Sequence, residues 1–139
     1  MRRIARVRHM LWSIITQSDI GLGARLGSGL MLPHPNGIVI HEDACVGDDC
    51  MIMQQVTIGM IGDGEVPVIG NRVYIGAGAK IIGKVVVGDG ARIGANAVVL
   101  SDVPPGHTAV GIPARIISRA ADMTPKSAAP RDASAKRLR

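Results

Sequence analysis

Aliphatic residues recur every six positions through most of this chain. A glycine often follows directly, and a small or aliphatic residue comes four positions later. The series comprises Ile20, Leu26, Leu32, Ile40, Val46, Ile52, Ile58, Ile69, Ile75, Ile81, Val87, Ile93 and Val99. A six-residue period of this kind predicts a parallel β-helix, in which each hexad forms one short strand and three strands close a triangular coil. Thirteen hexads therefore predict an all-β solenoid of about four and a half coils.

Consecutive hexads are assigned to the three faces of the coil in turn, so that every third hexad falls on the same face. The first face takes the hexads that start at Ile20, Ile40, Ile58, Ile81 and Val99. The second takes Leu26, Val46, Ile69 and Val87, and the third takes Leu32, Ile52, Ile75 and Ile93. On the third face the third hexad positions then form one outward column of His34, Gln54, Ala77 and Ala95. At one strand spacing per coil, this column is about 14 Å long, so a long thin ligand could lie along it with its reactive end at His34.

The series breaks between Gly59 and Ile69. The inserted stretch, Met60 to Val68, is rich in glycine and contains Pro67. Solenoids accept insertions as loops on one face, often the binding face. We therefore expect this loop to cover the site as a lid.

Both ends of the chain differ from the repeat. Residues 1–17 place apolar residues near helical spacing, which predicts a short amphipathic helix that covers the open first coil. Its four arginines leave a membrane-surface helix as an alternative that is not favoured at this stage. The β-helix domain is expected over 18–117, and the Ala-, Ser-, Pro- and Lys/Arg-rich stretch 118–139 is expected to be a disordered basic tail.

Charge and composition exclude several classes of function. The net charge of +5 belongs to the two ends, because residues 18–117 sum to −3. A basic folded surface for nucleic acid is therefore not expected. No apolar run approaches the roughly 18 residues of a membrane span, and no secretory signal is recognised, so a cytoplasmic location is expected. Cys45 and Cys50 are then expected to be free thiols.

Residues 19–117 resemble the catalytic domain of serine O-acetyltransferase. The matching stretches are DIGLGARLGSGLMLPHPNGIVIHEDACVGDD, QQVTIG, IGAGAKIIGKVVVGDGARIGANAVVL and VPPGHTAVGIPARII. The resemblance implies a left-handed β-helix, a homotrimer with sites between subunits, and acetyl-CoA as acyl donor. It also implies direct attack on the thioester, with no acyl-enzyme and no metal.

The same resemblance assigns roles to individual residues. It implies that His34 is the general base and that Asp19, fifteen residues earlier, orients the imidazole. Backbone N–H groups at Gly59 and Met60 are candidates for stabilising the oxyanion. The donor is expected to run past two alanines and to place its phosphates near three basic residues; these donor-binding candidates are Ala77, Ala95, Lys80, Arg92 and Arg115.

The acceptor is where the sequence departs from the family pattern. Pro33 stands where the family has an acidic residue, and Glu65-Val66 stands where the family has an Arg-His pair before a proline. Because these positions belong to the serine pocket, we expect a neutral sugar or glycan hydroxyl as acceptor, with L-serine as the alternative.

Two further classes remain as alternatives. A metal enzyme like the gamma-class carbonic anhydrases would use three histidines, but His34, His41 and His107 lack the H-x4-H pair of that family. A non-catalytic β-helix scaffold is the other possibility, against which the presence of both Asp19 and His34 argues.

Overall fold

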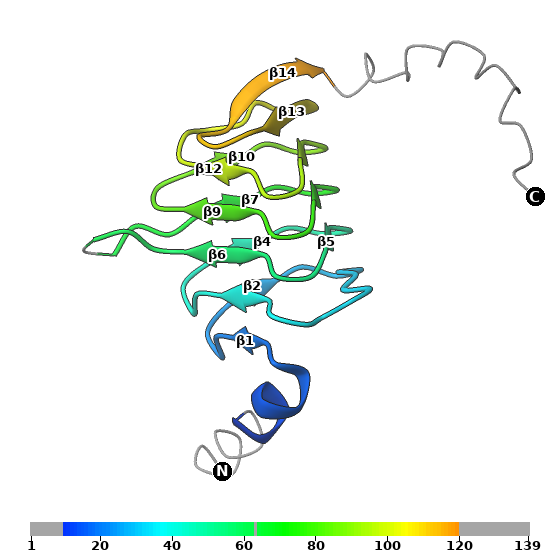
Figure 1. The fold of residues 1–139 in the computed structure, drawn as a ribbon, viewed down its shortest axis with the longest axis vertical. Helices are drawn as coiled ribbons and strands as arrows, with labels where there is room; N and C mark the ends of the chain where they lie inside the picture. The colour runs from blue at the N-terminus through cyan, green and yellow to red at the C-terminus, as the bar shows by residue number, and fades with distance from the viewer. Residues whose placement is uncertain (1–9, 63, 120–139) are drawn as a thin grey trace, which may run out of the picture.

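A computed structural model describes residues 10–62 and 64–119, and in this part of the chain short strands wind into a three-sided prism (Figure 1). The first sheet contains β1 (Asp19–Ile20), β3 (Val39–Ile40), β6 (Thr57–Gly59), β9 (Lys80–Ile82) and β12 (Val98–Val99). The second contains β2 (Arg25–Leu26), β4 (Cys45–Val46), β7 (Val68–Ile69) and β10 (Val86–Val87). The third contains β5 (Met51–Ile52), β8 (Tyr74–Ile75), β11 (Arg92–Ile93), β13 (His107–Val110) and β14 (Arg115–Arg119).

The three sheets are the three faces that the hexads predict. Pairing is parallel along the coils and in register, so that Ile40 lies opposite both Ile20 and Ile58, one coil away on either side. Among the strands that the structure describes, β13 and β14 alone pair antiparallel. The predicted left-handed parallel β-helix of hexapeptide repeats is confirmed, with one short helix at residues 10–16.

The core is a stack of aliphatic side chains inside the prism. The residue that begins each central hexad is buried, and so is the small or aliphatic residue four positions later, except in the hexad of Ile58, which runs into the loop. Fully or almost fully buried members include Ile52, Ile58, Ile75, Ile81, Val87, Ile93, Ala79, Ala91 and Ala97. Cys50 occupies one of these small inward positions, and burial raises the pKa of its thiol. It is therefore a small core residue, as its place in the hexad predicts.

One corner of the prism carries a ladder of polar side chains. The backbone N–H of Ser28 donates to Asp48 Oδ1 (2.7 Å), that of Asp48 to Asn71 Oδ1 (2.8 Å), and that of Asn71 to Asp89 Oδ1 (2.8 Å). Hydrogen bonds from the Asn71 backbone and side chain lower the pKa of the Asp89 carboxyl. The coils approach closely here, because a Cβ on Gly27 would overlap the backbone of Gly47. Each coil thus supplies the hydrogen-bond acceptors that its neighbour's turn requires.

The two ends of the solenoid are closed differently. At the carboxyl end β14 folds back antiparallel on β13 and continues through Arg119, two residues beyond the predicted domain boundary at 117. The rest of the predicted tail, 120–139, lies outside the described residues. At the amino end the helix at residues 10–16 lies below β1 (Figure 1), and residues 1–9 of the predicted helix lie outside the described part.

The orientation of this helix differs from the expected cap. Its two small polar residues, Ser13 and Thr16, are half-buried, while Leu11, Ile14 and Ile15 are exposed. Trp12 borders a cleft with Ile20 and Leu26 of the first coil, so the apolar side is only partly turned toward the prism. Among the described residues, none of the helices has the length and apolar character that crossing a bilayer requires.

Burial of the inward stack predicts a sharp contrast between two adjacent valines. Val87→Ala removes two methyl groups from a fully buried site and should lower the free energy of unfolding by about 2 kcal/mol. Val86→Ala, at a position that is 50% exposed on the same strand, should change it by less than about 0.5 kcal/mol. Thermal and urea unfolding at one fixed protein concentration measure both; equal effects would contradict the inward assignment.

Candidate active site

His34 lies in the segment that leads from the third sheet to β3. Its side chain is exposed, and its own carbonyl accepts a hydrogen bond from the backbone N–H of Asn36 (2.8 Å). The segment is tied to the chain below it, since Gly37 N–H donates to the carbonyl of Gln17 (2.9 Å) and Ser18 Oγ donates to the carbonyl of Pro35. Together with the bond from the Met31 N–H to the carbonyl of Cys50 (2.8 Å), these contacts hold the backbone on both sides of His34.

Asp19 begins β1 on the neighbouring face and lies opposite Val39. Its backbone N–H donates to the carbonyl of Ile38 (2.8 Å), so it sits beside the end of the His34 segment. Among residues 10–62 and 64–119, however, neither a hydrogen bond nor an ion pair joins the Asp19 and His34 side chains. The structure places the two residues in adjoining segments without forming the dyad, which stays a prediction.

Asp19 instead borders a small cleft on the first face. The cleft has a volume of about 410 Å³ and is also lined by His41 and Glu42. His41 Nδ1 accepts a hydrogen bond from the backbone N–H of Asp43 (3.2 Å) and lies 3.8 Å from the carboxylate of the same residue. These contacts hold His41 within its own turn.

The register of the strands in the third sheet aligns the residues of the predicted outward column. Met31 pairs with Met51, and Ile75 pairs with both Ile52 and Ile93; these pairings stack His34, Gln54, Ala77 and Ala95 on successive coils. Gln54 is the column residue next to His34. Its Oε1 is buried and has no hydrogen-bond partner in the described part of the chain. A buried oxygen without a partner beside the candidate base makes Gln54 a candidate for binding a hydrogen-bond donor of the substrate.

The three basic candidates for the donor phosphates have different surroundings. Lys80 Nζ donates to the carbonyl of Gln55 (2.6 Å) and so supports the corner between the third and first sheets. The Arg92 guanidinium carbon lies 4.8 Å from the centre of the Tyr74 ring, on the third face. Arg115 is exposed at the start of β14. Arg92 and Arg115 therefore present their charge on the same face as the column.

The predicted lid is a narrow loop between β6 and β7, which projects from the prism in Figure 1. Gly59 ends β6, and its carbonyl accepts a hydrogen bond from the backbone N–H of Gly83 (3.0 Å). Met60 is exposed, and Ile61 pairs with Glu65 across the loop.

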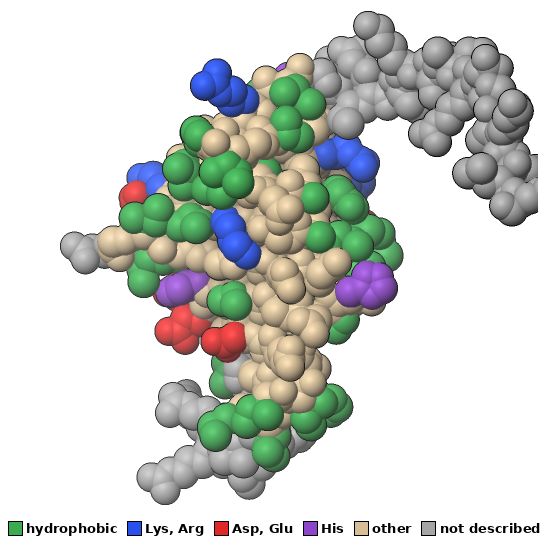
Figure 2. All heavy atoms as spheres, viewed as in Figure 1, with side chains coloured by type: hydrophobic (Ala, Val, Ile, Leu, Met, Phe, Trp, Pro, Cys, Tyr) green, Lys and Arg blue, Asp and Glu red, His purple; other side chains and the backbone are tan. Residues whose placement is uncertain are grey.

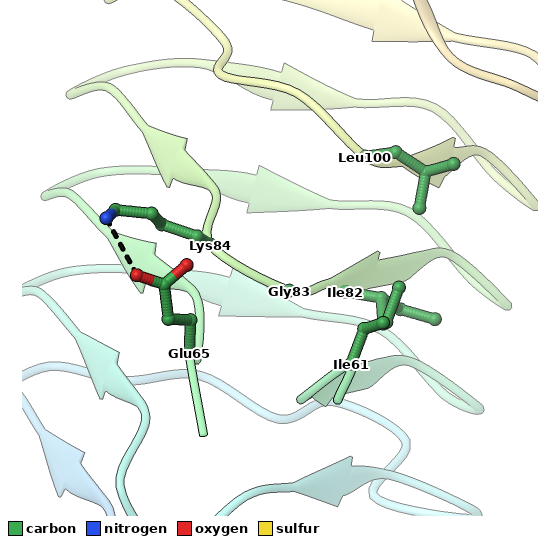
Figure 3. A pocket seen from close by; sticks show the side chains of 6 residues that line it. All are labelled: Ile61, Glu65, Ile82, Gly83, Lys84 and Leu100. Carbon is green, nitrogen blue, oxygen red and sulfur yellow. Dashed lines mark hydrogen bonds and ion pairs between the residues drawn. The ribbon is translucent and has the colours of Figure 1, made fainter. Parts of the chain in front are cut away.

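A cleft of about 650 Å³ lies where this loop meets the coil above (Figure 3). Apolar side chains of Ile61, Ile82 and Leu100 line one part of it. Glu65 closes another part through an ion pair with Lys84, with 2.7 Å between Oε1 and Nζ. The charge of Glu65 is thus matched by Lys84, nineteen positions later in the sequence.

The His34 column and the loop cleft occupy different edges of the prism. The column follows the edge between the third and first sheets, whereas the loop leaves the edge between the first and second sheets. The whole width of the first sheet separates them within one chain. Within one chain the column and the loop cleft therefore do not form a common site.

Metal binding by the three described histidines is one of the alternatives to an acyltransferase site. In the part of the chain that the structure describes, no group of three or more His, Cys, Asp or Glu side chains is placed to hold a metal ion. His107 Nδ1 is 2.9 Å from the carbonyl of Pro105, within its own turn.

Comparison with known proteins is consistent with this geometry. The family model described as bacterial transferase hexapeptide (six repeats) matches residues 67–101. The serine acetyltransferase of Helicobacter pylori strain J99 is 49% identical over 119 residues, which cover 84% of this chain and 70% of that protein.

Two solved structures show the same relationship in three dimensions. Soybean serine acetyltransferase complexed with serine has a TM-score of 0.79 at 42% identity, over 84% of this chain and 49% of that one. Serine acetyltransferase from Brucella abortus strain S19 in complex with coenzyme A has a TM-score of 0.81 at 44% identity, over 84% of this chain and 48% of that one. This chain thus spans about half of those two proteins, and it belongs to the serine acetyltransferase family of hexapeptide-repeat acyltransferases.

Proposed function

We propose that this protein is an acetyl-CoA-dependent O-acetyltransferase whose acceptor is L-serine. The main support for the proposal is the placement of His34. Its exposed imidazole lies at the end of the outward column, on a hydrogen-bonded backbone segment, and the chain belongs to the serine acetyltransferase family. The relatives that bind serine and coenzyme A, by their descriptions, support the two substrates.

The acceptor proposed here replaces the sugar hydroxyl expected from the sequence. The relatives support L-serine better than a neutral sugar. One reason for expecting a sugar was the negative charge of Glu65, which would repel the carboxylate of an amino acid. Lys84 pairs with Glu65 and balances its charge. The repulsion that Glu65 would exert on the carboxylate of L-serine is therefore reduced.

In the proposed reaction His34 acts first as the general base and then as the general acid. Its imidazole takes the proton of the serine hydroxyl as that oxygen attacks the thioester carbonyl. The carbon–oxygen bond forms, and the backbone N–H of Met60 is the candidate donor to the resulting oxyanion. When the carbon–sulfur bond breaks, the imidazolium returns its proton to the thiolate of coenzyme A. O-acetylserine and free coenzyme A then leave, and the histidine is regenerated.

The donor is proposed to lie along the column. Ala77 and Ala95 leave room for the thin pantetheine arm, and the exposed Arg92 and Arg115 are suited to phosphate oxygens. Lys80 would first have to release the carbonyl of Gln55, so its part in donor binding is secondary.

The assembly proposed is a homotrimer with sites between subunits. In one chain His34 and Asp19 are open to water, and Met60 with its loop lies across the first sheet. A neighbouring copy would supply the loop as the second wall, exclude water and bring Asp19 and His34 into a closed environment in which a hydrogen bond between them is worth more.

The acceptor assignment predicts selectivity in a thiol-release assay with acetyl-CoA. L-Serine should be acetylated with a kcat/KM on the order of 10⁴ M⁻¹s⁻¹ or more, the ordinary range of a dedicated enzyme. D-Serine and N-acetylglucosamine serve as stereochemical and sugar controls and should react far more slowly. Faster release with N-acetylglucosamine would restore the sugar acceptor.

The roles of the two candidate catalytic residues predict a graded loss. His34→Ala should lower kcat by about 10²- to 10⁴-fold with little change in the affinity for coenzyme A, because the base is lost but the donor groove is intact. Asp19→Asn should cost less, since it orients the imidazole without transferring the proton. Wild-type turnover in His34→Ala would exclude His34 as the base, and an unchanged rate in Asp19→Asn would exclude the dyad.

The ion pair in the loop predicts an effect on the acceptor alone. Lys84→Gln leaves the Glu65 charge unmatched and should raise the KM for L-serine by about threefold, a modest change because the pair is solvent-exposed. Adding Glu65→Gln to that variant should restore the value, and the KM for acetyl-CoA serves as the internal control. An unchanged KM for serine in Lys84→Gln would place the pair outside the acceptor site.

A further inference from the structure

The side chain of Gln54 carries a buried oxygen whose hydrogen-bonding capacity is unused. Gln54 follows β5, at the turn that leads from the third sheet to the first. Its Oε1 is buried and has no hydrogen-bond partner within residues 10–62 and 64–119. Such an oxygen is rare in a folded protein, because the hydrogen bond to water that it gives up on folding is not replaced. A ligand that brings a donor to this oxygen would supply the missing bond.

The turn itself does not require a polar side chain at this position. In the next two coils the same column position is occupied by Ala77 and Ala95. The backbone carbonyl of Gln54 accepts a hydrogen bond from the N–H of Gly78 (2.9 Å), and that of Ala77 accepts one from the N–H of Asn96 (2.8 Å). The backbone contact is thus the same with either side chain. The carboxamide of Gln54 is an addition to the repeat and not one of its structural requirements.

Gln54 lies between the candidate base and the rest of the donor column. His34 is one coil away on one side, and Ala77 is one coil away on the other. A donor whose thioester is at His34 and whose arm runs past Ala77 has to cross Gln54 with the first part of that arm. In Figure 2 this edge of the prism lies on the right, opposite the projecting loop, and uncharged groups make up most of the visible surface there. The surroundings therefore suit an uncharged part of the donor.

The covalent structure of acetyl-CoA decides which of its groups reaches Gln54. Two methylene groups separate the thioester sulfur from the first amide nitrogen of the arm. In an extended arm this nitrogen lies about 4.8 Å from the reacting carbonyl carbon, which is one coil spacing. With that carbon at the level of His34, the amide N–H falls beside Gln54. It is an uncharged donor, and Oε1 is an uncharged acceptor.

The ammonium group of L-serine is the other donor near His34, and it fits this oxygen less well. An ammonium carries three N–H donors and a full positive charge, whereas Oε1 of Gln54 is a single neutral acceptor that is shielded from water. Burying an ammonium against one neutral oxygen leaves its charge uncompensated. The secondary amide offers one N–H and no charge, which matches what the buried oxygen lacks.

We propose that Gln54 determines specificity for the donor by accepting, at Oε1, a hydrogen bond from the amide N–H nearest the thioester sulfur. The bond sets how far the thioester carbon lies from His34, and it favours donors that carry such an amide over simple thioesters. The inference rests on the proposed function, from which it takes the donor and its direction along the column. Gln54 holds the donor and takes no part in proton transfer.

Replacing Gln54 by methionine tests this contact with little change in shape. Methionine has nearly the length of glutamine, but its sulfur is only a weak acceptor. Gln54→Met should raise both the Kd of coenzyme A, measured by titration calorimetry, and the KM for acetyl-CoA by about tenfold, the effect of losing one buried hydrogen bond. The KM for L-serine, measured at saturating acetyl-CoA, should stay within about twofold of the wild-type value.

Two controls separate this contact from a general effect on the fold. Gln55→Asn changes the neighbouring, exposed glutamine and keeps a residue type that tolerates its positive φ of 59°, so both KM values should remain at the wild-type level. The free energy of unfolding of Gln54→Met should equal or exceed that of the wild type, because the oxygen that is removed has no partner among the described residues.

Three results with the variant would overturn the proposal. An unchanged Kd for coenzyme A in Gln54→Met would remove the contact with the donor. A rise in the KM for L-serine alone would assign the oxygen to the acceptor. A loss of folding stability with equal changes in both KM values would make Gln54 a structural residue.

Calorimetry with coenzyme A also distinguishes a failure of this inference from a failure of the proposed function, because it requires no turnover. If the wild-type protein binds coenzyme A but does not acetylate L-serine, the proposed acceptor is wrong, and a weaker affinity in Gln54→Met still supports the contact. A wild-type protein that does not bind coenzyme A would overturn both the proposed function and the role of Gln54.

Discussion

Parallel stacking of one coil on the next is the interaction on which the rest of this molecule depends. Strands of two or three residues have no stability alone, and each coil satisfies the backbone groups of its neighbours. The aliphatic residue of each hexad lies directly above the corresponding residue of the coil below, so hydrogen bonding and apolar burial reinforce each other. His34, the column beside it and the loop after Gly59 are all placed by this repetition, since their positions follow from the coil and face on which they occur.

The sequence predicts this part of the structure well because a single period determines both the face and the register. The three sheets and the stacking of His34 on Gln54 follow from counting hexads, once the interruptions are treated as bulges that keep the order of faces. The ion pair of Glu65 with Lys84 does not follow in the same way. It joins a loop without periodicity to the coil above it, and only the path of the loop decides which charge lies near.

Other features are missed for different physical reasons. Helical spacing predicts that one side of the N-terminal helix is apolar, but it does not predict how much of that side the first coil covers, and Leu11 and Ile15 remain exposed. Asp19 and His34 are separated by a corner that contains Pro35, and the direct hydrogen bond between them is absent from the single chain. The six-residue period fixes the face and the coil of each residue, but it does not fix the path of the segment that contains Pro35, and that path decides how the His34 side chain is directed.

The antiparallel return of β14 over β13 has a consequence for solubility. A parallel solenoid ends in a strand edge whose free N–H and C=O groups match the first coil of any other such chain, which is the template for fibre growth. In this protein the terminal strand runs in the opposite direction and its register with β13 shifts between Thr108 and Ala109. An incoming coil with the regular six-residue register would find neither the direction nor the spacing that it needs. On the third sheet the fold-back therefore blocks the addition of a further parallel coil.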